Sequence, residues 1–473
     1  MRLGALISVA GIDGSNLDTA MASTEVTGVA HDSRSVQPGD LFCCIPGAAH
    51  DGHDFAAQAV RSGASALVCE RPVGLMTPTL VVPSVRTAMP LLAAAVHGWP
   101  ARRLDLVGVT GTNGKTSVAH LLTWILARSG RRTAVHGTLS GGRTTPEATD
   151  LQAILGRWVS EDVETAVIEV SSHALAQHRV DGTEFALVGF TNLSRDHLDF
   201  HASMSDYEVA KARLFDGSFS SRAVVMVDTV PGRRMATRAR DAGMEVTEVD
   251  LAAAGGVIRP DGVGFEWRGH PVEVSTPGRF TIANALLAAE MAAALGVDEP
   301  DVVDGLGSAP PVPGRFEPVP LEGGPTVVVD YAHTPDALAA ALATAREITG
   351  GRLVVVFGCG GGRDRGKRPE MGRIAMAGAD MVVVTSDNPR GEPPEGVIAD
   401  ILSGMDSAPG LVEPDRRSAI AAALGLAGPD DLVLIAGKGH EDTQETEGHL
   451  EPFDDRQVTR QEWARMSGDG GAG

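Results

Sequence analysis

Residues 106–117, Leu-Val-Gly-Val-Thr-Gly-Thr-Asn-Gly-Lys-Thr-Ser, constrain the fold of this chain more than any other stretch. The first four predict a short buried strand, and residues 117–127 place apolar side chains at helical spacing. A glycine-rich turn before a helix N-terminus gathers backbone N–H groups, and this turn adds a lysine and a hydroxyl that can hold Mg²⁺. We therefore predict a phosphate loop whose ligands are Gly111, Thr112, Asn113, Gly114, Lys115, Thr116 and Ser117.

The loop departs from the strict P-loop pattern at one position, because Val109 stands where that pattern has glycine. The alternative interpretation is an ordinary strand–turn–helix corner with an incidental lysine. We disfavour it because Lys115, Thr116 and both flanking elements are in register with one another.

The composition disfavours several classes of function. A formal net charge of −21 argues against binding to nucleic acid or to an anionic membrane. No apolar run approaches the roughly 20 residues that span a bilayer, and the first apolar run is too short for a signal peptide. The four cysteines, Cys43, Cys44, Cys69 and Cys359, show no zinc-binding spacing. We therefore expect a cytoplasmic protein in a reducing compartment.

The length of 473 residues predicts about three domains. We place a small α/β domain at residues 1–100, a central domain with the phosphate loop at 101–314, and a second α/β unit at 315–473. Short buried strands alternate with helical segments in the last two, a pattern that indicates parallel, doubly wound sheets. The predicted fold class is α/β, with a central P-loop parallel-sheet domain and a C-terminal Rossmann-like domain.

In the last domain, each predicted strand runs directly into a polar loop. These strands are residues 326–329, 353–357, 381–385 and 432–435, and the loops include residues 358–368, 386–390 and 436–442. The carboxyl ends of parallel strands share one edge of a sheet, where ligands bind. We therefore expect one composite site rather than four separate solvated loops.

Three residues of the central domain suit catalysis but also have plainer explanations. Glu169 interrupts an apolar strand, and a buried carboxylate needs a cation, which is either Mg²⁺ or an arginine. His197 and His201 are four residues apart, but no third soft ligand is spaced for zinc. We treat His201 as structural and His197 as a candidate metal ligand. Lys211 shares a helix face with apolar side chains, so it either extends to water or acts near the metal.

Seven motifs occur in order along the chain. They are Thr110-Gly-Thr-Asn-Gly-Lys-Thr116, Glu169-Val-Ser-Ser-His173, Phe190-Thr-Asn-Leu-Ser-Arg-Asp-His-Leu-Asp199, Tyr207-Glu-Val-Ala-Lys211, Asp330-Tyr-Ala-His-Thr-Pro-Asp336, Asp387-Asn-Pro-Arg390 and Gly437-Lys-Gly-His-Glu-Asp442. With this combination, which covers nearly the whole length, the chain resembles the Mur ligases of peptidoglycan synthesis.

The resemblance implies an N-terminal domain for the UDP end of a UDP-muramyl substrate, a central ATPase domain and a C-terminal domain for an incoming amino acid. It also implies ATP as co-substrate, Mg²⁺, and a CO₂-derived carbamate on Lys211 that holds the metal. That role reverses our plainer interpretation of the lysine. The implied catalytic residues are Lys115, Glu169, His197 and Lys211, and the implied metal ligands are Thr116, Glu169, His197 and carbamylated Lys211.

Positions that match the family supply the remaining site residues. Beside the nucleotide they are Asn284, Arg315, Asp330 and His333. For the UDP-muramyl substrate they are Ser33, Thr144, Thr145, Ser171, Gln177 and Arg179. For diaminopimelate they are Arg363, Asp387, Asn388, Pro389, Arg390, Gly437 and Glu441.

The implied reaction joins an amino acid to a carboxylate of the UDP-muramyl dipeptide through an acyl phosphate, with ATP converted to ADP. In the family, Asp-Asn-Pro-Arg marks members that add diaminopimelate, and Arg390 can hold its distal carboxylate with both ends of its planar fork. The resemblance also implies a cytoplasmic enzyme of cell-wall synthesis, on which cell shape and division depend. We expect a monomer that binds neither nucleic acid nor membranes.

Three departures from the family pattern leave alternatives open. Thr281 replaces an asparagine, the segment between Gly137 and Thr144 is several residues shorter than usual, and Gly362 stands where the family often has aspartate. The competing readings are a lysine-adding or other amide ligase of the superfamily, such as a folylpolyglutamate or cyanophycin synthetase, and a degenerate homologue that binds without catalysis. Asp387-Asn-Pro-Arg390 argues against the former, and intact Lys115 and Lys211 argue against the latter.

Overall fold

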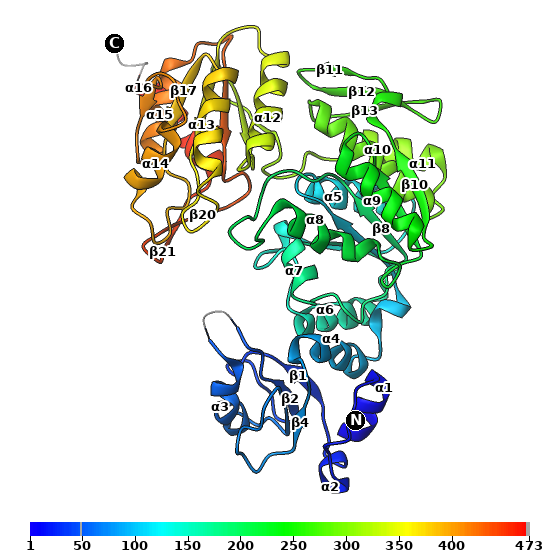
Figure 1. Cartoon of the computed structure of the whole chain (residues 1–473). Helices are drawn as coiled ribbons and strands as arrows, with labels where there is room; N and C mark the ends of the chain where they lie inside the picture. The colour runs from blue at the N-terminus through cyan, green and yellow to red at the C-terminus, as the bar shows by residue number, and fades with distance from the viewer. Residues whose placement is uncertain (48–49, 470–473) are drawn as a thin grey trace.

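The computed structural model describes residues 1–47 and 50–469, in which three α/β domains follow one another along the chain (Figure 1). The first domain has a parallel sheet in the order β1-β2-β3-β4. Alternate residues of β2 pack on its two faces, with Leu41 and Cys43 toward α1 and α4 and Phe42 toward α3, and Cys44, which follows the strand, also packs toward α3. The elements are α1 (Leu3–Ala10), α2 (Thr19–Ala22), β1 (Gly28–Ala30), β2 (Asp40–Cys43), η1 (Gly52–Phe55), α3 (Ala56–Arg61), β3 (Ala66–Cys69), β4 (Thr79–Val81) and α4 (Val85–Val96).

The second domain is built on a six-stranded parallel sheet in the order β10-β9-β8-β5-β7-β6. Its elements are η2 (Pro100–Arg103), β5 (Asp105–Thr110), α5 (Lys115–Arg128), β6 (Thr133–His136), η3 (Thr138–Ser140), α6 (Ala148–Ser160), β7 (Thr165–Glu169), α7 (Ser172–Ala176), β8 (Leu187–Phe190), α8 (Met204–Ala212), η4 (Arg213–Phe215), β9 (Arg222–Met226), α9 (Val230–Asp241), β10 (Glu245–Val249), η5 (Leu251–Ala253), α10 (Arg279–Ala294) and α11 (Glu299–Gly307). The predicted doubly wound sheet is confirmed.

The strand order of this sheet explains where its site lies. The chain runs from β5 to the edge strand β6, returns to β7 beside β5, and then continues on the opposite side of β5 with β8. The loops that follow β5, β7 and β8 therefore open at a switch point of the sheet, which is where open α/β sheets bind ligands. These loops contain residues 111–114, 170–171 and 191–203.

A small antiparallel sheet was not predicted. It consists of β11 (Val257–Arg259), β12 (Gly262–Trp267) and β13 (His270–Val274), and it packs against α10 and α11. Its buried residues, which include Phe265 and Trp267, join the core beneath α5. In Figure 1 it lies at the edge of the second domain that faces the third.

The third domain has a mixed sheet in the order β14-β15-β19-β16-β17-β18, in which only the β14–β15 pair is antiparallel. Its four predicted strands are confirmed as β15, β16, β17 and β19. The hairpin β20–β21 was missed. The elements are β14 (Glu317–Val319), β15 (Thr326–Asp330), α12 (Pro335–Ile348), β16 (Leu353–Phe357), α13 (Lys367–Gly378), β17 (Met381–Val384), α14 (Pro394–Leu402), β18 (Leu411–Val412), α15 (Arg416–Leu426), β19 (Leu432–Ala436), β20 (Thr443–Thr446), β21 (His449–Pro452) and α16 (Asp455–Asp469).

Contacts between the domains are concentrated at two places. α4 packs against α6, which joins the first domain to the second. The second and third domains meet through the loops that line the cleft described below and through α12, which contacts α10 and β11. In residues 1–47 and 50–469, no helix is both long enough and apolar enough to cross a membrane.

Candidate active site

A cleft of about 770 Å³ is lined by residues of both the second and the third domains. The phosphate loop (residues 111–117) and residues 138–145 contribute from the second domain. Loops that follow β16, β17 and β19 contribute from the third. A smaller hollow of about 110 Å³ shares several of these loops and reaches Lys367 and Gly437. The predicted convergence of the C-terminal loops is therefore observed, and they meet the phosphate loop.

The phosphate loop is held in a shape that requires glycine. Gly111 and Gly114 have φ angles of 150° and 86°, where residues with side chains are strained. A Cβ on Gly111 would also collide with Thr191, and one on Gly114 with the side chain of Asn284. In the described structure no side chain caps α5, which leaves the N–H groups of its first turn for a ligand.

Lys115 is folded back onto its own loop. Its Nζ donates to the carbonyl oxygens of Gly111 at 2.9 Å and Thr112 at 2.8 Å. Loss of surrounding water lowers the pKa of this ammonium, and the negative charge of Glu169 acts in the opposite direction. A phosphate placed in the loop would offer the ammonium a charged acceptor in place of these carbonyls.

Glu169, at the end of β7, is bound to the loop by hydroxyl and N–H groups rather than by an arginine. Its Oε2 accepts from Thr116 Oγ1 at 3.1 Å and from Thr138 Oγ1 at 3.0 Å, and its Oε1 accepts from the Thr138 N–H at 2.9 Å. Carboxylate and hydroxyl oxygens fit Mg²⁺. Among the described residues, no group of three His, Cys, Asp or Glu could hold a metal alone. The oxygens of Glu169 and Thr116 would need phosphate oxygens to complete a magnesium shell.

Lys211, on α8, points into the protein and not to water, so our plainer interpretation of this residue is wrong. It is 1 % exposed, and its Nζ donates to the carbonyl of Gly111 at 2.7 Å. The Nζ also lies 4.6 Å from the centre of the Tyr207 ring, whose hydroxyl contacts Thr112 Oγ1 at 3.1 Å. Burial lowers the pKa of Lys211 well below its ordinary value. The lowered pKa favours the neutral amine, which is the nucleophilic form of the side chain, beside the phosphate loop.

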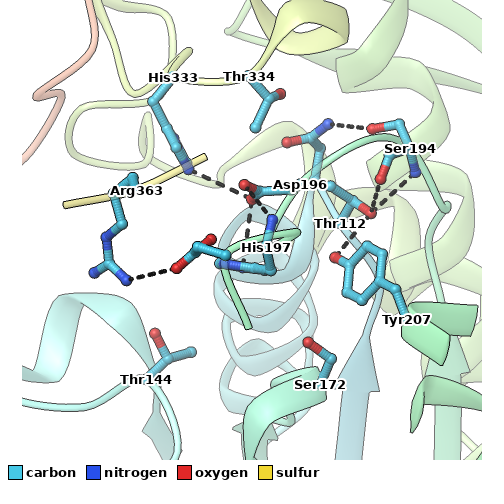
Figure 2. Close-up of polar contacts among 12 residues, drawn as sticks. Thr112, Thr144, Ser172, Ser194, Asp196, His197, Tyr207, His333, Thr334 and Arg363 are labelled. Carbon is cyan, nitrogen blue, oxygen red and sulfur yellow. Dashed lines mark hydrogen bonds and ion pairs between the residues drawn. The ribbon is translucent and has the colours of Figure 1, made fainter. Parts of the chain in front are cut away.

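Asp196 and two histidines form a polar group at the side of the cleft (Figure 2). One carboxylate oxygen of Asp196 lies 3.3 Å from His197 Nε2 and 3.7 Å from His333 Nε2. Burial lowers the pKa of His197 to about 2, so its imidazole is neutral and its nitrogen can act as a ligand. Burial favours the neutral form of Asp196, but His333 and neighbouring cations outweigh it and hold its pKa below the ordinary value.

The predicted nucleotide contacts lie on both sides of the phosphate loop. Arg315 crosses from the third domain and donates to Thr116 Oγ1 at 2.9 Å. Asn284 and Ser117 line a small hollow beside Arg315. The Asp330 carboxylate accepts from the Phe316 N–H at 2.7 Å, so it orders the segment that carries Arg315. The hydroxyl of Thr281, which replaces the family asparagine, is bonded to the Pro277 carbonyl at 3.1 Å.

The residues predicted to bind the UDP-muramyl substrate divide into two groups. Thr144, Thr145, Ser171 and Arg179 line the cleft, and Thr145 is hydrogen-bonded to both Ser171 and Arg179. Thr145 Oγ1 accepts from the Ser171 N–H at 3.0 Å, and Arg179 donates to the Thr145 carbonyl at 3.0 Å. Gln177 lies outside the lining of the cleft, and its Oε1 accepts a hydrogen bond from the Arg179 guanidinium at 2.6 Å. Buried Ser33 also lies outside the lining, in the first domain.

The residues predicted for diaminopimelate form what we call the C-terminal pocket, whose members are Arg363, Asp387, Asn388, Arg390, Gly437 and Glu441. The Asn388 amide donates to Glu441 Oε2 at 2.6 Å and accepts from the Glu445 N–H at 3.0 Å. Arg390 donates to the Gly361 carbonyl at 2.8 Å and lies 3.4 Å from the Glu445 carboxylate. Pro389 lies outside the lining of the cleft and of the smaller hollow. Its carbonyl oxygen lies so close to Gly361 that a Cβ at that position would collide with it.

Gly362 stands where the family often has aspartate, and the backbone at this position explains why glycine fits. Its φ of 62° lies in the left-handed region, which glycine adopts without strain. The Gly362 N–H donates to Glu392 Oε1 at 2.6 Å, so this position ties the loop after β16 to the loop after β17 through its backbone.

Ion pairs connect the loop that follows β8 with the loop that follows β16, across the domain boundary. Arg195 lies 3.2 Å from Asp364 and 3.9 Å from Glu370. Arg363 lies 3.7 Å from Asp199, and Figure 2 shows the guanidinium end of Arg363 directed toward the region of His197. Residues of the C-terminal pocket are therefore tied to the second domain.

Several residues at the site were not predicted. Thr138 binds Glu169, Asp196 orients two histidines, and Glu445 neutralises Arg390. The Asp-His pair at 196–197 was present in a quoted motif and could have identified Asp196 as the partner of His197. No motif in the sequence pointed to Thr138 or Glu445. Thr138 lies in η3 and Glu445 in β20, and neither element was predicted.

Three family models match the chain in succession. The "Mur ligase family, catalytic domain" matches residues 25–99, the "Mur ligase middle domain" matches residues 109–292, and the "Mur ligase, glutamate ligase domain" matches residues 314–439. Together they span the phosphate loop and most of the C-terminal pocket.

Similar proteins extend the match over nearly the whole chain. A UDP-N-acetylmuramoyl-L-alanyl-D-glutamate–2,6-diaminopimelate ligase of Streptomyces coelicolor is 42% identical, with 94% of each chain covered. The protein of the same name from Parasynechococcus marenigrum is 44% identical and covers 95% of this chain and 96% of its own.

Solved structures agree. One diaminopimelate ligase with the same name has a TM-score of 0.68 at 32% identity, with 99% of both chains covered. A MurF ligase from Thermotoga maritima, solved with ADP, has a TM-score of 0.67 at 20% identity and shows likeness of fold alone, over 95% of this chain and 100% of its own. The chain therefore belongs to the Mur ligase family.

Proposed function

We propose that this protein is the ATP-dependent ligase that joins meso-2,6-diaminopimelate to the D-glutamate carboxylate of UDP-N-acetylmuramoyl-L-alanyl-D-glutamate. The reaction converts ATP to ADP and phosphate and supplies the third residue of the peptidoglycan precursor peptide. Relatives that are 42% and 44% identical over nearly the whole chain carry the name of this activity. The observation that supports it best is one cleft lined by both the phosphate loop and Arg390.

The chemical problem is the activation of a carboxylate in water. A carboxylate does not condense with an ammonium group, but transfer of the γ-phosphoryl group of ATP produces an acyl phosphate and ADP. A neutral amine then attacks the acyl carbon, and phosphate leaves. Phosphoryl transfer depends on positioning and on stabilisation of negative charge more than on a protein nucleophile. The free N–H groups at the start of α5 and the ammonium of Lys115 provide both.

We assign the nucleotide to the phosphate loop, with Gly111 to Ser117 around the phosphates and Asn284, Arg315, Asp330 and His333 beside them. Bound Mg²⁺ would neutralise phosphate charge, and Thr116, Glu169 and His197 are the residues that would hold it. The low pKa of His197 keeps a lone pair available for this role. Arg315 already contacts Thr116, so the third domain contributes a positive charge at the same place.

The fourth proposed metal ligand is Lys211 in carbamylated form. Its lowered pKa favours the neutral amine, and a neutral amine adds to CO₂ to form a carbamate and releases one proton. Carbamylation replaces the buried amino group with an anion. An anion beside Gly111 suits a cation held between phosphates, whereas an ammonium there would repel it.

We assign the UDP-muramyl substrate to Ser33 of the first domain and to Thr144, Thr145, Ser171, Gln177 and Arg179 of the second. The residues of the second domain lie near Glu169, so a dipeptide carboxylate bound among them would approach the γ-phosphate. We propose residues 1–100, 101–314 and 315–473 as the domains for the UDP end, the nucleotide and the amino acid. We also propose that the enzyme acts as a monomer in the cytoplasm, without binding to membranes.

Selection of the amino acid is assigned to the C-terminal pocket, in which Arg363, Asp387, Asn388, Arg390, Gly437 and Glu441 surround the ligand and Pro389 fixes the backbone. Diaminopimelate differs from lysine by a carboxylate at its far end. Arg390 can bind both oxygens of that carboxylate, and lysine would leave the guanidinium without them. The pocket therefore favours diaminopimelate and penalises lysine.

The direct test measures phosphate release and product mass with ATP, Mg²⁺, the UDP-muramyl dipeptide and one amino acid at a time. We expect turnover with meso-diaminopimelate and little with L-lysine or ornithine. Equal use of lysine would overturn the amino-acid assignment but leave the ligase assignment standing. Binding of nucleotide without turnover for any amino acid would identify a degenerate homologue instead.

A further inference from the structure

Arg368 is a fully buried arginine with no assigned role in the reaction. It lies at the start of α13, its side chain is 0% exposed, and it is one of the two largest fully buried side chains among the described residues. A buried guanidinium is costly unless anions and carbonyls surround it. The identity of those partners therefore indicates what the residue does.

Two partners of Arg368 belong to the segments that follow β16 and β17, which carry Arg363, Asp387, Asn388 and Arg390 of the C-terminal pocket. Its guanidinium makes two bonds to the Glu392 carboxylate, at 2.8 and 3.0 Å, and one to the Gly360 carbonyl at 3.2 Å. Asp400 of α14 accepts a further bond at 2.9 Å. Gly360 belongs to the glycine loop (residues 358–366), and Glu392 follows the Asp-Asn-Pro-Arg loop (residues 387–390).

The same two loops touch again next to Arg390. Gly361 donates its N–H to the Asn388 carbonyl at 2.9 Å and accepts from Arg390 at 2.8 Å. Arg390 itself has a φ of 54°, a left-handed conformation that a residue with a side chain adopts only under constraint. The position of the Arg390 guanidinium therefore depends on how closely the two loops are held together.

We propose that Arg368 is a positioning residue that sets the spacing of the glycine loop and the Asp-Asn-Pro-Arg loop, and thereby aims Arg390 at the distal carboxylate of diaminopimelate. Arg368 does not line the cleft or the smaller hollow, so it acts through Arg390 and not on the substrate. This inference rests on the proposed function of the C-terminal pocket.

The charges around Glu392 support a fixed geometry for its contact with Arg368. The bonds from Arg368, together with the Gly362 N–H, lower the pKa of Glu392 to about 2. The carboxylate is therefore ionised throughout the physiological range, and one side chain binds the loop backbone and the buried guanidinium at once. Two parallel N–H bonds to one carboxylate also fix orientation, which a single-point contact from lysine would not reproduce.

The test compares Arg368→Met and Arg368→Lys with the wild-type protein and with Arg365→Met. Arg365 is a matched control because it pairs with the same Asp400 at 3.0 Å, while its side chain is 67% exposed and lies outside the pocket. We expect the KM for diaminopimelate to rise about tenfold to a hundredfold in Arg368→Met, because small misplacements of a binding group cost that much. The KM values for ATP and for the UDP-muramyl dipeptide should change less than about twofold.

Arg368→Lys should restore folding, measured by thermal unfolding, while leaving most of the KM defect. Arg365→Met should resemble wild type. The inference is wrong if folded Arg368→Met or Arg368→Lys keeps the wild-type KM for diaminopimelate, or if all three KM values rise together. If wild type does not ligate diaminopimelate at all, the proposed function has failed instead, which separates the two failures.

A double-mutant cycle keeps the inference testable if Arg368→Met does not fold. Glu392→Gln removes the charge that joins the two loops, and Asp400→Asn removes the charge on α14. We expect Glu392→Gln to raise the KM for diaminopimelate and to be less than additive with Arg368→Lys, because both act on one contact. If Asp400→Asn alone reproduces the defect, Arg368 only anchors α14 and the positioning role is refuted.

Discussion

The phosphate loop and the C-terminal pocket line the same cleft, but their residues are distributed differently along the chain. The phosphate loop uses seven consecutive residues, which run from the turn after β5 into the first turn of α5. The C-terminal pocket uses one to three residues from each of three loops. One helix and one strand (α13 and β17) separate the first two loops, and two helices and two strands (α14, β18, α15 and β19) separate the last two. The first site is built by local geometry, and the second exists only when several strands are in register.

The two sites also handle positive charge differently. Lys115 rests on neutral carbonyls of its own loop, which an incoming phosphate can replace. Arg390 faces a carboxylate from the β20 strand, Glu445, and a carbonyl from the glycine loop. A contiguous site can therefore tolerate change elsewhere in the fold, whereas a composite site should be sensitive to residues that never touch its ligand.

The local character of the phosphate loop has one exception, which Lys211 tests: this residue lies 100 positions from Gly111 in the sequence, yet it donates to the Gly111 carbonyl. Lys211→Ala should abolish ligation, because the proposed carbamate and its metal are lost. A short carboxylic acid added to the variant should restore part of the activity by supplying an oxygen ligand. Intact mass measurement of active wild-type protein should find the carbamate. A free amine in fully active enzyme would contradict the assignment.

The local character of the phosphate loop is tested by Lys115→Ala. The variant should fold normally, because the side chain contacts only carbonyls of its own loop. Turnover should fall by roughly 3–4 kcal/mol of transition-state stabilisation, or about 10²–10³-fold, as for other lost charge-stabilising donors. Circular dichroism and steady-state kinetics check the two halves of the prediction. Near-normal turnover would remove the basis for the phosphate-loop assignment.

The composite pocket should respond in selectivity more than in overall rate. Arg390→Ala should lower the preference for diaminopimelate over lysine by roughly 1.5–3 kcal/mol, the usual value of a charged hydrogen bond. The KM for ATP should stay within about twofold of wild type. Competition between the two amino acids, followed by mass spectrometry of the product, measures the ratio. An unchanged ratio of diaminopimelate to lysine in the product would show that another residue binds the distal carboxylate.

The smallest expected effect concerns stability as a function of pH. Glu392 has a folded-state pKa of about 2, below its ordinary value of 4.5, because Arg368 and the Gly362 N–H stabilise its ionised form. The unfolded chain binds a proton more readily, so this contribution to stability is present above pH 4.5 and is lost as the pH falls toward about 2. Glu392→Gln should therefore lower the urea midpoint at neutral pH more than at about pH 3. Glu395→Gln, an exposed position in the next helix, serves as the control.

Much of the fold could be predicted because its strands are short, buried and apolar. The strands β15, β16, β17 and β19 were located correctly, and so was β5 with its phosphate loop. The sheet β11–β13 and the hairpin β20–β21 were missed because no continuous run of buried apolar residues marks them. The strands β20 and β21 have no buried residue, and in β12 and β13 half-buried or exposed residues interrupt the buried ones. Their strand character depends on what they pack against, and no local pattern records it.

The site shows the same division. Residues of the phosphate loop lie where a strand–turn–helix must place them. Glu169 and Lys211 could be identified as unusual, but their partners could not: Glu169 binds Thr138 and Thr116, and Lys211 binds the Gly111 carbonyl. The sequence separation between these partners reaches 100 residues. Such pairings follow from strand order, which the spacing of apolar residues does not specify.

The ion pairs between the loops after β8 and β16 connect the proposed nucleotide site physically with the C-terminal pocket. Arg195 with Asp364 and Arg363 with Asp199 join the nucleotide domain to the C-terminal pocket. A ligand that favours this arrangement of the domains therefore raises the affinity for any other ligand that favours it. Thermodynamic linkage makes any such effect reciprocal: under the proposed function, the factor by which nucleotide changes amino-acid affinity equals the factor by which the amino acid changes nucleotide affinity.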